Sequence, residues 1–334
     1  MINFRLLVVL LIFLNFSCST NKPKFSNENE KATHYAASIT LDELKEGVYE
    51  ISSDAYEGRN TGEPGQKKAA QFLKDSYKSI GIESAYRSDD YFQEIPASFL
   101  PKGIKASENV VAYIEGSEFP NEILVLSAHY DHIGMDGEEV FNGADDDGSG
   151  TIAVLEMAEA FQIAKKAGHG PKRSILFLHN TAEEKGLYGS KWYTENSIFP
   201  IENHIANLNI DMIGRVDAKH KKNPNYLYLI GSDRLSKELH DISETANKKF
   251  TNINIDYTFN DPKDPNMFYY RSDHYNFAKN NIPVIFYFNG IHEDYHKITD
   301  TPEKINYELL RKRSKLIFHT AWELVNRPEK VRLD

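Results

Sequence analysis

The alternation of short apolar runs with longer stretches of helical period constrains the fold of this chain most strongly. The short runs have the length of buried strands, and the longer stretches repeat apolar residues at the spacing of a helix. This alternation predicts an α/β fold with a mostly parallel, mixed sheet sandwiched by helices. The expected strands lie at residues 109–114, 122–128, 174–178, 205–210, 226–230 and 283–288, and the expected helices at 41–51, 65–80, 151–164, 186–196, 235–250, 273–279 and 307–325.

The N-terminus resembles an export signal. Arg5 is followed by an apolar run, Leu6–Leu14, which is too short to span a bilayer, since that needs roughly 20 residues. Cys18 is the only cysteine, so a disulfide within the chain is impossible. Its position after this run resembles the lipidation site of bacterial lipoproteins, although Asn15 stands where that pattern favours Leu. We expect a lipid anchor on Cys18, with plain secretion as the alternative.

Domain organisation follows from the length and from the polar stretch after Cys18. We expect a signal peptide at residues 1–17, a flexible tether at 18–35 and a single catalytic domain at 36–334. The expected location is the periplasmic or cell-surface side of a bacterial membrane. The net charge of -10 argues against non-specific nucleic-acid binding, which depends on basic patches.

Residue types that bind metal ions gather in five places, each in a polar loop or directly after an apolar run. In open α/β sheets, binding sites form outside the carboxyl ends of the strands, so we expect these places to converge. Nitrogen and carboxylate ligands without cysteine favour zinc, with manganese or cobalt as alternatives. The five segments are 128–132, 142–150, 181–190, 209–214 and 291–296.

The first two segments combine a histidine with carboxylates. His129 and Asp131 are two residues apart, so in extended chain they point to the same side, which suits a histidine ligand and a carboxylate that fixes its ring. Three consecutive aspartates, 145–147, repel one another and are tolerable in a solvated loop or around a cation. The alternative is an acidic cap on the helix that follows.

The remaining segments supply further candidate ligands. Glu183 and Glu184 are adjacent and point in different directions, so one can bind a metal ion while the other accepts a proton from water. Asp211 follows an apolar strand, where carboxylates seldom occur unless they are paired or metal-bound. The last segment holds His292 and His296, and their spacing does not distinguish between them.

The motifs together resemble the co-catalytic di-zinc peptidase family that includes bacterial leucyl aminopeptidase and aminopeptidase Y, with glutamate carboxypeptidase II and glutaminyl cyclase as more distant relatives. Their order along the chain is the family's order, and the resemblance runs from about residue 41 to the C-terminus. The matching segments are 129–131 (His-Tyr-Asp), 143–150, 182–190, 209–214 (Asn-Ile-Asp-Met-Ile-Gly), 272–274 (Ser-Asp-His) and 295–301.

The resemblance implies a role for each matched residue. It implies two zinc ions per chain, with Asp146 as the carboxylate that bridges them. The other ligands it implies are Glu184 and His296 for one ion, and His129 and Asp211 for the second. It further implies that Glu183 is the general base, Asp131 the partner that orients His129, Tyr295 a stabiliser of the oxyanion, and Met212 part of the pocket for the terminal side chain.

The implied function is zinc-dependent hydrolysis of N-terminal residues from peptides, by a metallo-aminopeptidase. Glutaminyl cyclase activity and carboxypeptidase activity on the same fold are alternatives; the latter needs cations that hold a terminal carboxylate, for which Arg215 and Arg271 are candidates. A non-catalytic binding protein is a further alternative, but such a protein is expected to have lost ligands or the base. The segment of about 70 residues before His129 is too short for an inserted protease-associated domain.

Overall fold

The computed structural model describes residues 23–334, so the expected signal peptide and Cys18 lie outside the described part of the chain. Its centre is a nine-stranded sheet in the order β1-β3-β7-β4-β8-β11-β9-β10, with β2 also paired to β3. The strands are β1 (Glu83–Ser84), β2 (Phe92–Ile95), β3 (Ser107–Ile114), β4 (Phe119–His129), β7 (Arg173–Asn180), β8 (His204–Ile210), β9 (Tyr226–Ile230), β10 (Asn254–Asp256) and β11 (Val284–Phe288). A separate hairpin is formed by β5 (Gly134–Asp136) and β6 (Glu139–Phe141).

The four central strands, β7, β4, β8 and β11, are mutually parallel. On either side of them, β3 runs antiparallel to β7 and β9 runs antiparallel to β11. In the parallel core, β7, β8 and β11 are buried over their whole length and β4 is buried from Ile123 onward, which is typical of sheets covered on both faces. The carboxyl ends of the four central strands therefore meet at one edge of the sheet.

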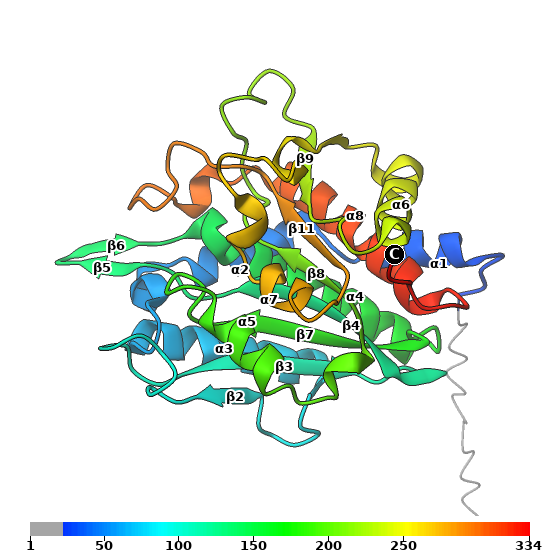
Figure 1. Ribbon diagram of the computed structural model, residues 1–334, viewed down its shortest axis with the longest axis horizontal. Coiled ribbons are helices and arrows are strands. Elements are labelled where there is room, and N and C mark those ends of the chain that lie inside the picture. The colour runs from blue at the N-terminus through cyan, green and yellow to red at the C-terminus, as the bar shows by residue number, and fades with distance from the viewer. Residues whose placement is uncertain (1–22) are drawn as a thin grey trace, which may run out of the picture.

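Helices cover both faces of the sheet (Figure 1), as the sequence predicts. One face carries α1 (Glu28–Ala36), α2 (Leu41–Ile51), α3 (Pro64–Ile80), α4 (Gly150–Lys166), α6 (Lys237–Ala246) and α8 (Tyr307–Asn326). The opposite face carries the short helices α5 (Tyr188–Glu195) and α7 (His274–Ala278). The predicted class, a mixed sheet between two layers of helices, is confirmed.

Side-chain caps fix where several helices begin. Thr40 accepts a hydrogen bond from the amide of Glu43 at the start of α2, and Asn306 does the same for Leu309 at the start of α8. Gly81 ends α3 in the left-handed conformation that glycine adopts at low cost. These local signals explain why α2 and α8 begin at the predicted residues.

Helix α1 corrects the expected tether, which is wrong over residues 28–35. Asn27 caps the helix, and Ala32, Tyr35 and Ala36 lie at helical spacing and are buried. The Tyr35 hydroxyl is hydrogen-bonded to His169 Nδ1 at 2.6 Å, and its ring stacks on Trp322 of α8. The few apolar residues of this polar segment therefore suffice to pack it onto the main core.

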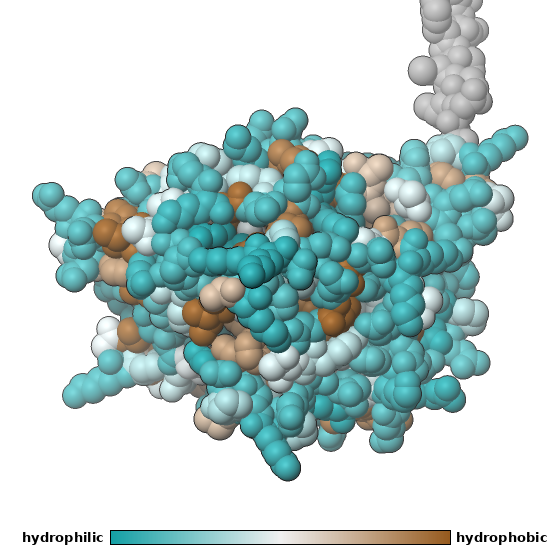
Figure 2. Space-filling view, turned by 90° about the horizontal axis from the view of Figure 1, so that it is seen from above, coloured by the Kyte–Doolittle hydropathy of each residue, from teal (hydrophilic) through white to brown (hydrophobic). Residues whose placement is uncertain are grey.

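The surface gives no sign of a membrane-spanning element in the described part of the chain. Among residues 23–334, no helix combines the length and the apolar character that crossing a bilayer requires. The face shown in Figure 2 is mostly hydrophilic, and its hydrophobic side chains form separate small patches. Isolated exposed apolar residues of this kind are normal on a folded protein.

Candidate metal centre

The candidate ligands follow the four central strands at their shared carboxyl edge. His129 is the last residue of β4 and is paired in register with Asn180, the last residue of β7. Because Ile210 ends β8 beside Tyr287 of β11, the loops after these two strands also begin side by side. The sequence segments that are distant along the chain, 129–132, 183–184, 211 and 292–296, are therefore brought to one edge of the sheet.

Asp146 lies at the centre of this edge, in the loop before α4. Its Oδ1 is 3.2 Å from His129 Nε2, and its Oδ2 is 3.1 Å from His296 Nε2. The two oxygens of one carboxylate thus face two different histidines. On the Oδ1 side, the ligand atoms of His129, Asp146 and Asp211 all lie within 4.8 Å of one another.

The Oδ2 side of Asp146 holds a second group of ligand atoms. Glu184 Oε2 is 3.2 Å from His296 Nε2, which places Glu184 and His296 together as the resemblance implies. The structure adds His132, for which the sequence predicted no role. Its Nδ1 is 2.9 Å from Glu184 Oε1. His132, Asp146 and Glu184 offer three ligand atoms within 4.8 Å of one another.

The polar atoms of this second group fit a bound cation. Asp146 Oδ2, Glu184 Oε1 and both ring nitrogens of His132 are buried and have no hydrogen-bond partner. Buried polar atoms are nearly always hydrogen-bonded, so a cluster of orphaned nitrogens and carboxylate oxygens indicates that a further group belongs among them. A donor set of histidine and carboxylate without cysteine suits zinc.

The electrostatics keep the Asp146 carboxylate ionised. Burial raises the pKa of Asp146, but the contacts with His129 and His296 outweigh it and hold the pKa well below its ordinary value. Burial likewise disfavours the charged form of His296, yet Asp146 and Glu184 raise its pKa to about 10. The ionised Asp146 carboxylate therefore favours positive charge beside it, which a bound cation would supply.

Glu183 lies on the wall of a small pocket beside this centre, with a cavity volume of about 30 Å³. Burial raises its pKa well above the ordinary value, and the Asp211 and Glu184 carboxylates raise it further. A carboxylate with a raised pKa suits a proton acceptor that works near neutral pH. The pocket is lined by His129, Asp146, Glu183, Asp211, Met212, Phe268, Arg271, Phe286, Phe288, Ile291 and Tyr295.

Comparison with known proteins decides the family. The profile of peptidase family M28 matches residues 109–321, which is more than half of the chain and includes every candidate ligand. The chain belongs to peptidase family M28.

Two relatives and one solved structure illustrate how this M28 chain compares with others. It is 26% identical over 310 residues to the leupeptin-inactivating enzyme 1 of Streptomyces exfoliatus, covering 86% of this chain and 62% of the relative. It is 32% identical over 162 residues to a probable zinc metalloprotease of Pyrenophora teres f. teres, and the match covers 46% of this chain and 32% of that relative. The crystal structure of the LapA aminopeptidase of Legionella pneumophila has the same fold, with a TM-score of 0.70 and 22% sequence identity. The match covers 97% of this chain and 81% of the LapA chain. The chain thus spans less than two thirds of the length of these two curated relatives.

In this M28 chain, Asp131 contacts the His129 ring more closely through its main-chain oxygen than through its carboxylate. Its carboxylate is 3.9 Å from His129 Nδ1, which instead contacts the main-chain oxygen of Asp131 at 3.1 Å. The carboxylate accepts hydrogen bonds from the Thr61 hydroxyl at 2.7 Å and from the backbone N–H of Glu183 at 3.1 Å. Asp131 therefore fixes the backbone at Glu183 and reaches His129 through its carbonyl group.

Tyr295 and Met212 both line the pocket, as expected of residues near a bound substrate. The Tyr295 ring stacks on the His296 imidazole, with ring centroids 3.8 Å apart and planes inclined by 21°. This stacking connects the position of the phenol to that of a candidate ligand. The backbone of Met212 is left-handed, with φ of 56°, and its N–H donates to Asp147 Oδ1 at 3.0 Å.

Ser272 supports the candidate ligand Asp211. Its hydroxyl donates to Asp211 Oδ2 at 2.6 Å and accepts from Asn209 Nδ2 at 2.8 Å. A hydrogen bond to the second oxygen of a ligating carboxylate fixes its orientation. The Ser-Asp-His motif at residues 272–274 therefore contributes a supporting side chain to the centre.

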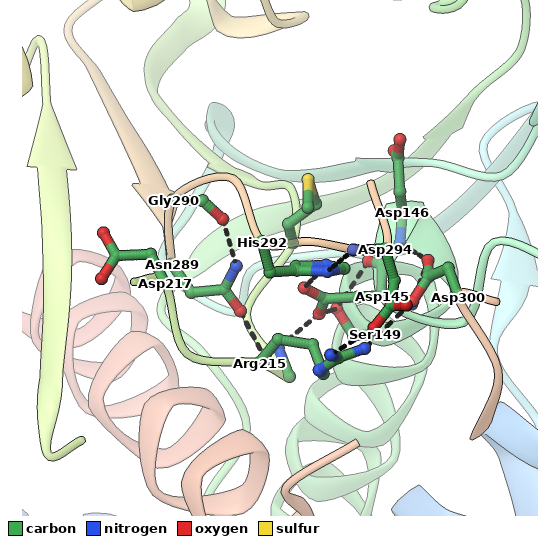
Figure 3. Close-up of polar contacts among 12 residues, drawn as sticks. Asp145, Asp146, Ser149, Arg215, Asp217, Asn289, Gly290, His292, Asp294 and Asp300 are labelled. Atoms are coloured by element: carbon green, nitrogen blue, oxygen red, sulfur yellow. Dashed lines mark hydrogen bonds and ion pairs between the residues drawn. The ribbon is translucent and has the colours of Figure 1, made fainter. Parts of the chain in front are cut away.

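A buried polar network holds the Asp146 loop in place (Figure 3). Asp300 Oδ2 accepts hydrogen bonds from the backbone N–H groups of Asp145 and Asp146, at 3.0 and 3.1 Å. Arg215 donates to Asp294 Oδ2 at 2.7 Å and lies 3.7 Å from Asp300 Oδ1. The loops that carry Asp146, Asp211 and His296 are thus tied together by ionic contacts.

His292 belongs to this network and not to the group around Asp146. Its Nε2 is 3.1 Å from Asp145 Oδ2, whereas His296 contacts Asp146 and Glu184. The structure therefore distinguishes the two histidines that spacing alone left open. It places all five expected ligands, His129, Asp146, Glu184, Asp211 and His296, at one centre.

Proposed function

We propose that this M28 chain is a zinc-dependent aminopeptidase that binds two zinc ions and removes N-terminal residues from peptides. The observation that carries the proposal is Asp146, whose two carboxylate oxygens face separate groups of ligand atoms. Asp146 with His129 and Asp211 would hold one ion, and Asp146 with Glu184 and His296 the other. When bound, zinc supplies Lewis acidity that acidifies water and polarises a carbonyl group.

The chain's own residues have separate tasks in peptide-bond hydrolysis. Glu183 accepts a proton from water and then donates it to the leaving amine, a role that its raised pKa supports. The hydrogen bond from the Glu183 amide to Asp131 keeps the base at the pocket wall. Tyr295 lines the same pocket, and in this proposal its phenol donates a hydrogen bond to the carbonyl oxygen as negative charge develops there.

The charges around the pocket support selectivity for an N-terminus. Glu183, the carboxylate in its lining that is not proposed to hold an ion, can attract a positively charged α-amino group. Met212 and the aromatic side chains of Phe268, Phe286 and Phe288 supply apolar contact for a substrate side chain. We infer that peptides with a free amino terminus are the substrates.

Arg271 keeps carboxypeptidase activity as a second candidate. It is exposed, lines the pocket and lies over the Phe268 ring at 4.8 Å, so its guanidinium is available to a substrate carboxylate. Arg215, the other cation considered, is buried and paired with Asp294, so it is not available. Only one of the two arginines thus supports this activity.

Peptides blocked at one end distinguish these functions. We expect the zinc-loaded full-length chain to release the N-terminal residue from a free peptide and from its C-terminally amidated form, but not from its N-acetylated form. Mass spectrometry of the products identifies the residue removed. Cleavage only from an open C-terminus, or cyclisation of N-terminal glutamine without hydrolysis, would contradict aminopeptidase activity.

We further propose that the protein is exported and held at a bacterial membrane by a lipid on Cys18. The support is the apolar run at residues 6–14 followed by a single cysteine. The full chain expressed in a bacterium should partition into detergent, and the Cys18→Ser variant into the aqueous phase. Identical partitioning of both, with no lipid mass on Cys18, would contradict the anchor.

A further inference from the structure

The His132 ring fills a buried space beside the metal centre. The side chain is fully buried, and its backbone N–H donates to the Arg59 carbonyl oxygen at 3.1 Å. Gly143, with φ of +55°, lies against the ring, and a Cβ at this position would come within 2.6 Å of the ring atoms Cγ and Cδ2. A glycine in the left-handed region therefore gives the imidazole room next to the Asp146 loop.

The Nδ1 atom of His132 points to the same space as two candidate ligands. It is 2.9 Å from Glu184 Oε1 and 3.8 Å from Asp146 Oδ2. Ligand atoms of one tetrahedral zinc ion lie roughly 3.3–3.5 Å apart, given zinc–ligand bonds of about 2.0–2.2 Å. The two distances bracket this value, and those between His296 and the same two carboxylates, 3.1 and 3.2 Å, lie just below it.

The short distance from His132 to Glu184 is not a hydrogen bond. Neither His132 Nδ1 nor Glu184 Oε1 has a hydrogen-bond partner, although the two atoms are 2.9 Å apart. The ring N–H direction therefore does not run toward the oxygen, as a hydrogen bond requires. Two close atoms that do not have hydrogen-bond geometry fit the arrangement of two ligands of one ion.

The His292–Asp145 pair shows why distance alone is not sufficient. Its nitrogen and oxygen are 3.1 Å apart and also lack hydrogen-bond partners. Yet in the described residues these two belong to no set of three ligand atoms, whereas His132 does. The Arg215 guanidinium also reaches Asp300 in that network, which disfavours a second cation there.

We propose that His132 binds the zinc ion on the Glu184 side through Nδ1, as a protein ligand additional to Asp146, Glu184 and His296. This inference rests on the proposed function, because it assigns one more residue to the same centre. Four protein ligands would close this site, whereas His129, Asp146 and Asp211 would leave a position open at the other. Structural zinc sites are typically closed and catalytic ones open, so the two ions would have different tasks.

X-ray absorption at the zinc edge tests the assignment by counting imidazoles. In the zinc-loaded full chain we expect about 1.5 imidazole nitrogens per zinc, from three histidines and two ions, falling to about 1.0 in His132→Ala if two ions are retained. The affinity of the Glu184 side for zinc should also fall in His132→Ala. The loss should exceed the roughly 10–100-fold that is typical when a residue that only supports a ligand is removed. The matched control is His204→Gln, a buried histidine at the other end of β8, which should change neither value.

Replacing His132 with cysteine provides a second test, in which a new absorption band should appear. In the cobalt-loaded full chain, His132→Cys should show a sulfur-to-cobalt charge-transfer band that the parent chain, with Cys18 alone, lacks. A count of about 1.0 imidazole per zinc in the parent chain, or no thiolate band in cobalt-loaded His132→Cys, would overturn the assignment.

The outcome also separates this inference from the proposed function. If the parent chain binds two zinc ions and cleaves peptides but has only two imidazole ligands, the inference about His132 fails alone. If the parent chain binds no zinc, the proposed function fails before His132 is tested. A loss of affinity in His132→Ala without loss of an imidazole would make His132 a positioning residue for Glu184 and would overturn its role as a ligand.

Discussion

At the scale of single residues, the two oxygens of Asp146 face two separate groups of candidate ligands. Oδ1 faces His129 and Oδ2 faces His296, while hydrogen bonds from the backbone N–H groups of Asp145 and Asp146 to Asp300 hold the loop. The carboxylate itself has no hydrogen-bonded partner at Oδ2. Its orientation is therefore set by the loop and leaves both oxygens for cations.

Glu183 is the residue whose removal should separate chemistry from metal binding. We expect Glu183→Gln to lower kcat by about 10²–10⁴-fold, because the amide cannot accept the proton from water. Zinc content should stay at the parent level, since Glu183 is absent from both groups of ligand atoms. Peptide turnover and metal analysis on the same samples measure both effects, and turnover equal to that of the parent chain would exclude Glu183 as the base.

Ser272 should matter through the ligand that it supports. We expect Ser272→Ala to weaken zinc binding by about 10–100-fold, because Asp211 loses the hydrogen bond that fixes its second oxygen. Competition with a zinc chelator measures the affinity. Ser314→Ala removes a buried hydroxyl that donates to the Leu310 carbonyl within α8 and should leave the affinity unchanged. Equal zinc affinities of the parent chain, Ser272→Ala and Ser314→Ala would contradict a role of Ser272 in supporting Asp211.

At the scale of secondary-structure elements, the sequence predicted the long elements well and the short ones poorly. The helix at 41–51 and the strand at 226–230 have the predicted bounds, because their apolar spacing is regular over their whole length. β1, β2 and β10 were not predicted, since they have two to four residues and no periodicity to detect. The direction of β3 and β9 was not predictable either, because residue patterns do not encode strand polarity.

Helix α1 gives a prediction about stability. We expect Tyr35→Ala to lower the free energy of unfolding by about 3–5 kcal/mol, as for other large buried side chains. Tyr35→Phe should cost only about 1 kcal/mol, because it removes the hydrogen bond to His169 but keeps the ring packed on Trp322. Urea unfolding of the full chain measures both values. No loss in Tyr35→Ala would mean that this segment is a tether after all.

Helix α4 contributes a dependence of stability on pH. Glu156 is 8% exposed, and its Oε2 has no hydrogen-bond partner. Burial, together with Glu43 and Glu159, raises its pKa from 4.5 to about 8. Between these values the folded chain retains a proton that the unfolded chain releases, so the free energy of unfolding falls as pH rises through this window.

Glu156→Gln should remove that dependence. We expect the substitution to stabilise the chain at pH 8 by roughly 1–4 kcal/mol more than at pH 5, because the amide stays neutral. Thermal unfolding at both pH values measures the difference. Glu195→Gln, at an exposed position of α5, is the matched control and should show no such difference. Equal effects of the two substitutions at both pH values would contradict the account.

At the scale of the whole molecule, the parallel core of the sheet explains why ligands so far apart in the sequence meet. The ends of β4, β7, β8 and β11 share one edge, and all the expected ligands lie at the last residue of β4, in the loops after the other three strands, or in the adjoining loop before α4. The sequence predicted this convergence from the strand ends. It did not predict that His132 faces Glu184 or that Asp131 hydrogen-bonds to the Glu183 amide, because such contacts depend on how the loops pack.

The central claim is that Asp146 is shared by two metal ions. Anomalous diffraction at the zinc edge from crystals of the zinc-loaded full chain tests it most directly. We predict two peaks about 3.5–4 Å apart, as in other two-metal sites, one beside His129 and Asp211 and the other beside Glu184, His132 and His296, with one oxygen of Asp146 next to each. A single peak, or two peaks of which only one touches Asp146, would contradict the account.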